Sequence, residues 1–194
     1  MKTDEVRKYV ARQLKWLQSL PEPQKRAELA RLRRGVGHEP GELPALWGSF
    51  LARMPEQLRG RDGPSEAEWA IYMALTLYAL HQQGESTVSM SRPGMTLGSA
   101  VRQLAEASAA GQDWTESGVI RRFNALATAD SMPEAAHHLR GMIQLLRQKE
   151  IPLDYPQLAV DLYRLQFAES VANIRLQWGR DLYRINTETK EKEN

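Results

Sequence analysis

Histidine, glutamate and arginine side chains in the second half of the chain are the groups whose spacing could do chemistry. His137 and His138 are adjacent, and Glu134 stands three residues before His137. Glu-x-x-His is half of the ligand set of a di-iron helical bundle, which also needs a second copy and two further glutamates. His38 and His81 lack that spacing, so the sequence holds no second copy. Three interpretations remain: a catalytic site, a surface that binds an acidic partner, or an ordinary solvated helix face.

Nucleophilic and cofactor chemistry finds little support in the sequence. The chain has no cysteine, which excludes thiol catalysis and cysteine-ligated zinc. It contains no Gly-x-Ser-x-Gly elbow, Walker A motif or dinucleotide fingerprint. The glycines of Gly94-Met-Thr-Leu-Gly98 flank a helix start and could bind phosphate or simply turn the chain. We therefore expect no catalytic residue, no metal and no cofactor.

Arginine side chains are stronger candidates for a function. Arg140 and Arg147 are seven residues apart, so on a helix they share one side with roughly 10 Å of rise between them. The planar guanidinium group binds phosphate bidentately and stays charged at neutral pH. These two arginines, like Arg31, Arg33 and Arg34, have no glutamate four residues before them that would explain them as simple pairing along a helix. The pattern predicts arginine-bearing faces that bind a polyanion.

The charge distribution is compatible with such a face. The net charge is only +2, but residues 1–34 carry ten Lys and Arg against four Asp and Glu. Residues 35–110 carry five against eight. A basic end on a near-neutral protein fits one surface that meets a polyanion. A solvated helix surface decorated with lysine and arginine is the alternative.

The elements that must position these arginines are helical almost throughout. Apolar residues recur at a spacing of 3.6, no stretch alternates like a β-strand, and the apolar run at 69–80 is too short to span a bilayer. Ser65 with Glu68 three residues on predicts a capping box that opens a central helix over 65–83. Two N-terminal helices separated at Pro21 precede it. Further helices are expected near 45–53, 96–109, 115–129, 133–149, 156–167 and 169–185.

The fold class expected from these elements is all-α, with two packed helical bundles and about nine helices. The segment 84–95 is poor in apolar residues and contains two glycines and a proline. It predicts a boundary between an N-terminal bundle over 1–86 and a C-terminal bundle over 87–186, followed by a frayed tail at 187–194. The charged N-terminus without an apolar h-region, and the absence of cysteine, suit a cytoplasmic protein.

Four motifs follow one another along the chain in an informative order. They are Leu-Arg-Arg-Gly at the end of an N-terminal helix, Arg-Arg-Phe-x-x-Leu, His-Leu-Arg-x-x-x-x-Leu-Leu-Arg, and Ile-Pro-Leu-Asp-Tyr followed by Leu-Ala-x-Asp-Leu. In their order and spacing, up to about residue 185, they resemble the CasB family, the small subunit of the type I-E CRISPR Cascade complex.

The resemblance implies a non-catalytic, all-helical subunit of an antiviral ribonucleoprotein complex. Two copies would lie head to tail along a crRNA-bearing backbone of repeated subunits and touch the large subunit. Their basic surfaces would steady the target DNA strand and the displaced strand of the R-loop. Phosphate contacts suffice for that role, because guide pairing reads the sequence. By position, the resemblance places nucleic-acid contacts on Arg31, Arg33, Arg34, Arg53, Arg102, Arg121, Arg122, Arg140 and Arg147.

Two other functions remain open at this point. An independent helical DNA-binding regulator would need a helix-turn-helix with a short turn and base-reading side chains. The segment 119–147 could adopt that shape only with an unusually long second helix. A helical enzyme with a metal in its bundle would hold stoichiometric iron, manganese or zinc.

Overall fold

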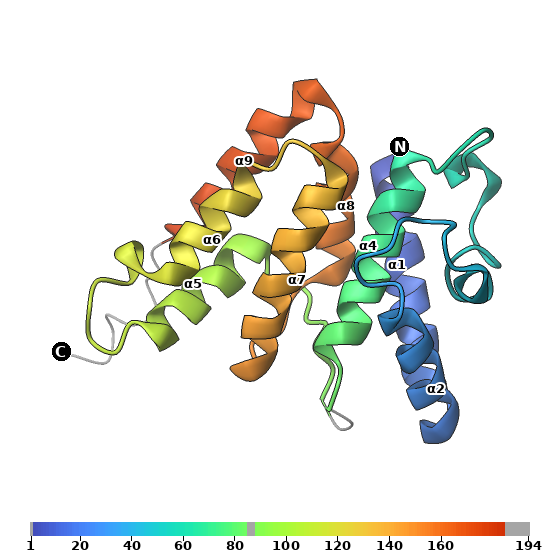
Figure 1. Ribbon diagram of the computed structural model, residues 1–194, viewed down its shortest axis with the longest axis horizontal. Helices are drawn as coiled ribbons and strands as arrows, with labels where there is room; N and C mark the ends of the chain where they lie inside the picture. Colours follow the sequence, from blue (N-terminus) through green and yellow to red (C-terminus); the bar gives the residue numbers. More distant parts are fainter. Residues whose placement is uncertain (1, 85–87, 185–194) are drawn as a thin grey trace.

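Nine α-helices make up most of the residues 2–84 and 88–184, which are those described by the computed structural model of the protein (Figure 1). Short 3-10 turns η1, η2 and η3 cover Pro44–Leu46, Glu56–Leu58 and Trp114–Glu116. The predicted all-α fold is confirmed, and the β structure of the described residues is limited to one isolated bridge. The helices are α1 Lys2–Ser19, α2 Glu22–Arg33, α3 Trp47–Phe50, α4 Glu66–His81, α5 Leu97–Ser108, α6 Gly118–Ala127, α7 Met132–Gln148, α8 Tyr155–Leu165 and α9 Ala168–Leu182.

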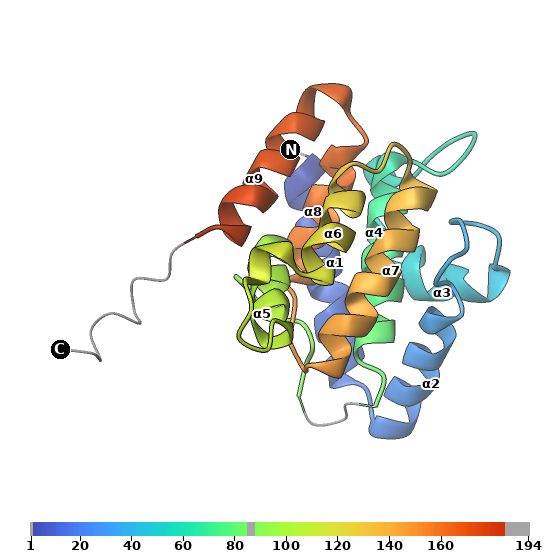
Figure 2. The same ribbon diagram turned by 60° about the vertical axis from the view of Figure 1, so that its left-hand side comes forward.

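Helix α4 is the centre of the arrangement and is buried on nearly all sides. The predicted capping box opens it: the Glu68 amide donates to the Ser65 hydroxyl at 3.0 Å, and the Ser65 amide donates to the Glu68 carboxylate at 2.7 Å. Helices α1, α2, α7 and α8 pack around α4 (Figure 1 and Figure 2). Helix α5 packs against α6 and α9, and α6 packs against α7. The arginine-bearing helices α2 and α7 are therefore positioned by the same buried helix.

The apolar core runs without a break from α1 to α9. Helix α8 packs along both α1 and α4, so the second half of the chain contributes to the core of the first half. The predicted boundary at 86/87 and the predicted frayed tail at 187–194 fall outside the described residues, so the division into two bundles at that point stays a prediction. Within the described ranges, no helix combines the length and apolar character needed to cross a membrane.

The region 45–53 differs from the helix predicted there. It forms only the η1 turn and the single helical turn of α3, which leaves Trp47 49% exposed. The Phe50 ring packs edge-on against Tyr72 at a centroid distance of 5.3 Å, and the Tyr9 hydroxyl donates to the Phe50 carbonyl at 2.6 Å. Helix α3 thus ends at a residue that other helices hold in place. The helices predicted near 65–83, 96–109, 115–129, 133–149, 156–167 and 169–185 agree with the structure within three residues at each end.

A buried carboxylate joins α8 to α9. The Trp178 indole donates to Asp161 Oδ2 at 2.8 Å, and the Gln157 amide donates to Asp161 Oδ1 at 2.7 Å. Burial raises the pKa of Asp161 to about 6, although these two hydrogen bonds oppose the shift and nearby Asp181 adds to it. Asp161 therefore favours its protonated form in the folded protein more than in the unfolded chain.

Stability should depend on pH through this carboxyl group. Because its pKa is raised on folding, its stabilising contribution is complete below pH about 3.8 and is lost as pH rises through about 6. A shift of this size corresponds to roughly 3 kcal/mol between the two limits. Thermal melts of the wild type and Asp161→Asn at pH 4, 5, 6 and 7 measure this effect. The Tm of the variant relative to that of the wild type should increase as pH rises. A difference in Tm that stays constant across this range would contradict the expectation.

Candidate nucleic-acid interface

Helix α7 exposes arginine because its apolar residues occupy the side that faces the core. The Glu134 amide donates to the Ser131 hydroxyl at 3.3 Å, which caps the helix, and Pro133 lies in its first turn, as predicted. Arg140 is exposed, and Arg147 is half-buried in the last turn, where the helix dipole favours a cation. The buried side consists of Ala135, Leu139, Met142, Ile143 and Leu146.

Helices α2 and α7 both pack against α4 (Figure 1), and arginines from both helices reach the C-terminal end of α4 and the turn after it. Arg147 Nη1 donates to Gln83 Oε1 at 2.8 Å, and Arg33 Nη1 reaches the Ala79 carbonyl at 3.5 Å. The guanidinium group of Arg140 lies beside the loop that follows α2, since a Cβ placed on Gly37 would be 3.8 Å from Nη1. We call this surface, made of Arg33, Arg140 and Arg147, the α2/α7 face.

Within the described part of the chain, no carboxylate pairs with the α2/α7 face. Arg33, Arg140 and Arg147 take part in no ion pair there. Burial lowers the pKa of Arg33, and the charge of Arg147 lowers it further, so the two guanidinium groups lie close enough to repel each other. Both remain charged at neutral pH. An anion placed between them would remove this repulsion and accept hydrogen bonds from both.

Arg31 points to a different partner. Its Nη1 lies 2.6 Å from Glu28 Oε2, and the same carboxylate accepts a hydrogen bond from the Ser49 hydroxyl. The inference that Arg31 has no ion pair along its helix is therefore wrong, because the glutamate stands three residues before it rather than four. Glu28 thus ties α2 to α3, and Arg31 neutralises the Glu28 carboxylate within α2.

Arg102 and Arg121 also make contacts within the protein. Arg102 Nε lies 2.8 Å from Glu106, four residues after it, and the guanidinium group stacks over the Trp114 ring at 5.4 Å. Arg102 is therefore already paired along its helix. Arg121 Nη1 donates to the Glu116 carbonyl at 2.9 Å and so holds the turn before α6.

The remaining predicted arginines lie on several parts of the surface. Arg53 stacks over the Trp16 ring on α1 at 4.6 Å. Arg34 and Arg122 are exposed, and among the described residues neither forms an ion pair or a side-chain hydrogen bond. The structure thus brings together three of the nine predicted arginines, and nucleic-acid contact by each of the nine stays a prediction. Sequence reasoning missed Gln83, which is 64 residues from Arg147 and carries no motif.

The sequence and fold of the chain also occur in known proteins. A family model described as CRISPR-associated protein Cse2 matches residues 28–183. The chain belongs to the Cse2 family. The resemblance to the CasB family seen in the sequence is thereby confirmed. A search of curated proteins finds no match.

Solved structures agree with the assignment to the Cse2 family. CasB from Thermobifida fusca is 33% identical, with 92% of this chain and 97% of that chain covered and a TM-score of 0.76. CasB from M. ruber is 25% identical, with 95% and 96% covered and a TM-score of 0.68. A Cse2-family CRISPR-associated protein from Thermus thermophilus is 27% identical, with 93% and 97% covered and a TM-score of 0.66.

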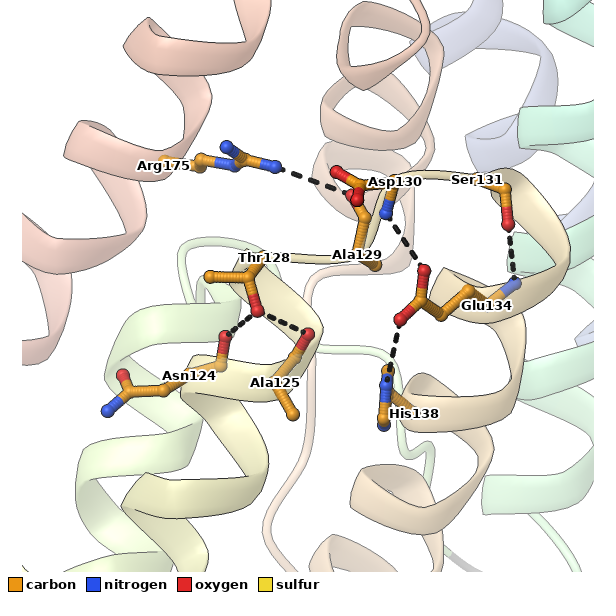
Figure 3. A network of polar contacts seen from close by, with 9 residues as sticks. All are labelled: Asn124, Ala125, Thr128, Ala129, Asp130, Ser131, Glu134, His138 and Arg175. Atoms are coloured by element: carbon orange, nitrogen blue, oxygen red, sulfur yellow. Dashed lines mark hydrogen bonds and ion pairs between the residues drawn. The ribbon is translucent and has the colours of Figure 1, made fainter.

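The two residues of the Glu-x-x-His motif of this Cse2-family chain, Glu134 and His137, contact other residues rather than each other. Glu134 Oε2 accepts from the Asp130 amide at 2.9 Å, and Glu134 Oε1 lies 3.7 Å from His138 Nε2 (Figure 3). Exposed His137 makes a ring contact with His138. From α9, Arg175 donates to the Ala129 carbonyl at 3.4 Å (Figure 3). Glu134 thus serves the turn between α6 and α7, and the described residues contain no cluster of three His, Asp or Glu suited to a metal ion.

The glycine pair before and within α5 has a packing role in this Cse2-family fold. The Gly94 amide donates to the Asp154 carboxylate at 2.8 Å, which places a negative charge where a phosphate would have to lie. A Cβ on Gly98 would overlap the Trp178 carbonyl oxygen, so α5 and α9 approach closely there. Of the two alternatives for this segment, the structure supports the turn rather than the phosphate site.

Proposed function

We propose that the chain is the non-catalytic small subunit of a type I-E Cascade complex and that its α2/α7 face holds DNA strands of the R-loop through phosphate contacts. One observation carries the proposal. In a member of the Cse2 family, three guanidinium groups from two separate helices meet on one surface, and no carboxylate of the described residues pairs with them.

The chemistry of this face suits phosphates better than bases. Arginine donates two parallel hydrogen bonds to a phosphate and keeps its charge. Arg140 and Arg147 are two helical turns apart along α7, so they can contact different phosphates of one strand. In a guide-directed complex the protein needs only such backbone contacts, because base pairing supplies the sequence specificity.

The partners follow from the same proposal. They are the backbone and large subunits, the crRNA, the target and displaced DNA strands, and a second copy of this chain placed head to tail. Arg34, Arg53, Arg102, Arg121 and Arg122 would contact nucleic acid or neighbouring subunits outside the α2/α7 face. Arg31 is the weakest member of the proposed set, because Glu28 already neutralises it.

We expect the isolated protein to bind DNA weakly, without sequence preference and with a strong dependence on salt. Phosphate contacts release counterions, so log affinity should fall linearly with log salt concentration, with a slope of about −2 to −3 for three arginines. Gel-shift titrations over a range of salt concentrations measure this slope. Arg140→Ala should make the slope shallower by about one. A salt-independent affinity, or a marked preference for one duplex sequence, would contradict the proposal and favour a helix-turn-helix regulator.

A further inference from the structure

A pocket lies between α2 and the end of α4, next to the α2/α7 face. Its volume is about 420 Å³, and Arg33 belongs both to its wall and to the α2/α7 face. Gln83, which accepts the hydrogen bond from Arg147, is also part of its wall. The pocket and the basic face are therefore continuous.

The pocket is positively charged. Among the residues that the structure describes, Lys25, Arg26 and Arg33 line it against one carboxylate, that of Glu22, which makes a net charge of +2 for this described lining. Glu22 is shared between Lys25 Nζ at 2.8 Å and Arg26 Nε at 3.0 Å, so it neutralises neither completely. The Lys25 side chain is only 17% exposed, an unusual position for a lysine. Arg147 adds a further cation at the side of Gln83.

The rest of the pocket wall consists of apolar side chains and of the side-chain amides of two glutamines. Leu29 is buried, and Ala30 beside it presents only a methyl group. The Gln82 side chain accepts a hydrogen bond from the Met90 amide and donates one to the Val88 carbonyl, which fixes the orientation of its amide group. A flat apolar ring with polar edges, joined to an anion, is complementary to such a site. The volume lies within the range of small-molecule pockets, roughly 300–1,000 Å³.

We propose that this pocket receives the base of one nucleotide of a single strand bound along the α2/α7 face, with a phosphate of that strand between Arg33 and Arg147. The proposal rests on the proposed function and adds the form of the nucleic acid. A base can enter the pocket only when it leaves its stack, which a single strand allows far more easily than a duplex. The face therefore selects a displaced or unpaired strand, whether DNA or RNA.

The test compares a short oligothymidylate with the abasic sugar-phosphate chain of the same length. Both carry the same phosphate charges, so a purely electrostatic face binds them equally. A base accommodated in the pocket should strengthen binding of the oligothymidylate by about tenfold, which corresponds to about 1.4 kcal/mol. Oligouridylate completes the set of single strands, and it should behave like the DNA strand. A thymidylate–adenylate duplex has about twice the phosphate charge, so its affinity is compared only between the wild type and a variant with a filled pocket, and it should be the same for both.

Two substitutions on the same helix separate the pocket from the charged face. Ala30→Phe fills the pocket without changing the charge, and we expect it to abolish the tenfold preference for the strand with bases. Ala27→Phe makes the same change at an exposed position of α2 that does not line the pocket, and it should leave the preference intact. Arg140→Ala should weaken both chains equally. Circular dichroism melts check that each variant is folded.

Each outcome decides between the two proposals. Equal affinity of the wild type for both chains overturns the pocket and leaves the phosphate-binding face standing. A preference for bases that survives in folded Ala30→Phe also overturns the pocket. No measurable binding of either chain by the wild type overturns both. A preference lost in Ala30→Phe and retained in Ala27→Phe supports both.

Discussion

The double variant Arg140→Ala, Arg147→Ala should bind target DNA at least about tenfold more weakly than the wild type in a complex assembled with the remaining Cascade subunits and crRNA. Hydrogen bonds to charged groups contribute about 1.5–3 kcal/mol each where they are desolvated, and about 1.4 kcal/mol corresponds to a factor of ten. Removing two guanidinium groups from the α2/α7 face also exposes no apolar core. The thermal stability should change little, because surface substitutions usually stay within about 0.5 kcal/mol.

His137→Ala is the matched control for this experiment. His137 lies on the same helix, one turn before Arg140, and is exposed, but its imidazole lacks the planar, permanently charged fork with which a guanidinium group binds phosphate. Its removal should leave target affinity close to that of the wild type. A double arginine variant that melts normally and binds target DNA like the wild type would show that the α2/α7 face serves a subunit interface or solvent. Loss of an activity in His137→Ala alone would instead revive an enzymatic role.

The second large effect concerns Gly98, where α5 and α9 touch. A Cβ at this position would overlap the Trp178 carbonyl oxygen and lie 2.8 Å from the Leu182 amide nitrogen. Both are backbone atoms, so Gly98→Ala can be accommodated only if the helices separate. Overpacking of this kind costs about 1–3 kcal/mol or more. The Tm should fall by roughly 5–10 °C for a protein of this size.

Gly141→Ala provides the comparison for Gly98→Ala. Gly141 is also inside an α-helix, but a Cβ there would meet nothing within 4 Å. Replacing such a glycine with alanine should stabilise the protein by about 0.5–1 kcal/mol, because alanine loses less backbone entropy on folding. The two substitutions are chemically identical, so opposite shifts of Tm isolate the contact between α5 and α9. A loss of stability in both, or in neither, would contradict this account of Gly98.

Local sequence signals predicted the helices well because each signal acts within a few residues. Ser65 with Glu68 marks the start of α4, and Pro133 after Ser131 marks the start of α7. The exposure of Arg140 also agrees with periodicity, since this residue lies off the buried side of α7 that includes Leu139. The short α3 could not be predicted, since Phe50 at its end is held by Tyr9 and Tyr72, which belong to other helices.

The candidate site was only partly predictable for the same reason. All three arginines of the α2/α7 face were selected from the sequence, but Arg33 and Arg147 are far apart in the chain and only the fold brings them together. The pairing of Arg31 with Glu28 was missed because only glutamates four residues before each arginine were considered, and Glu28 stands three residues before Arg31. The pocket depends on Lys25 in α2 and Gln83 in the turn after α4, which are far apart in the chain and form no motif.

The packing of α8 against α1 has a consequence for synthesis on the ribosome. Helix α1 is made first, but the helix that covers much of its apolar side begins only at Tyr155. At a synthesis rate of about 5–20 residues per second, the apolar side of α1 waits on the order of ten seconds for its partner. Val6, Val10 and Leu14 must therefore be shielded by α4 or by a chaperone during translation. The nascent chain is most open to aggregation before α8 leaves the exit tunnel.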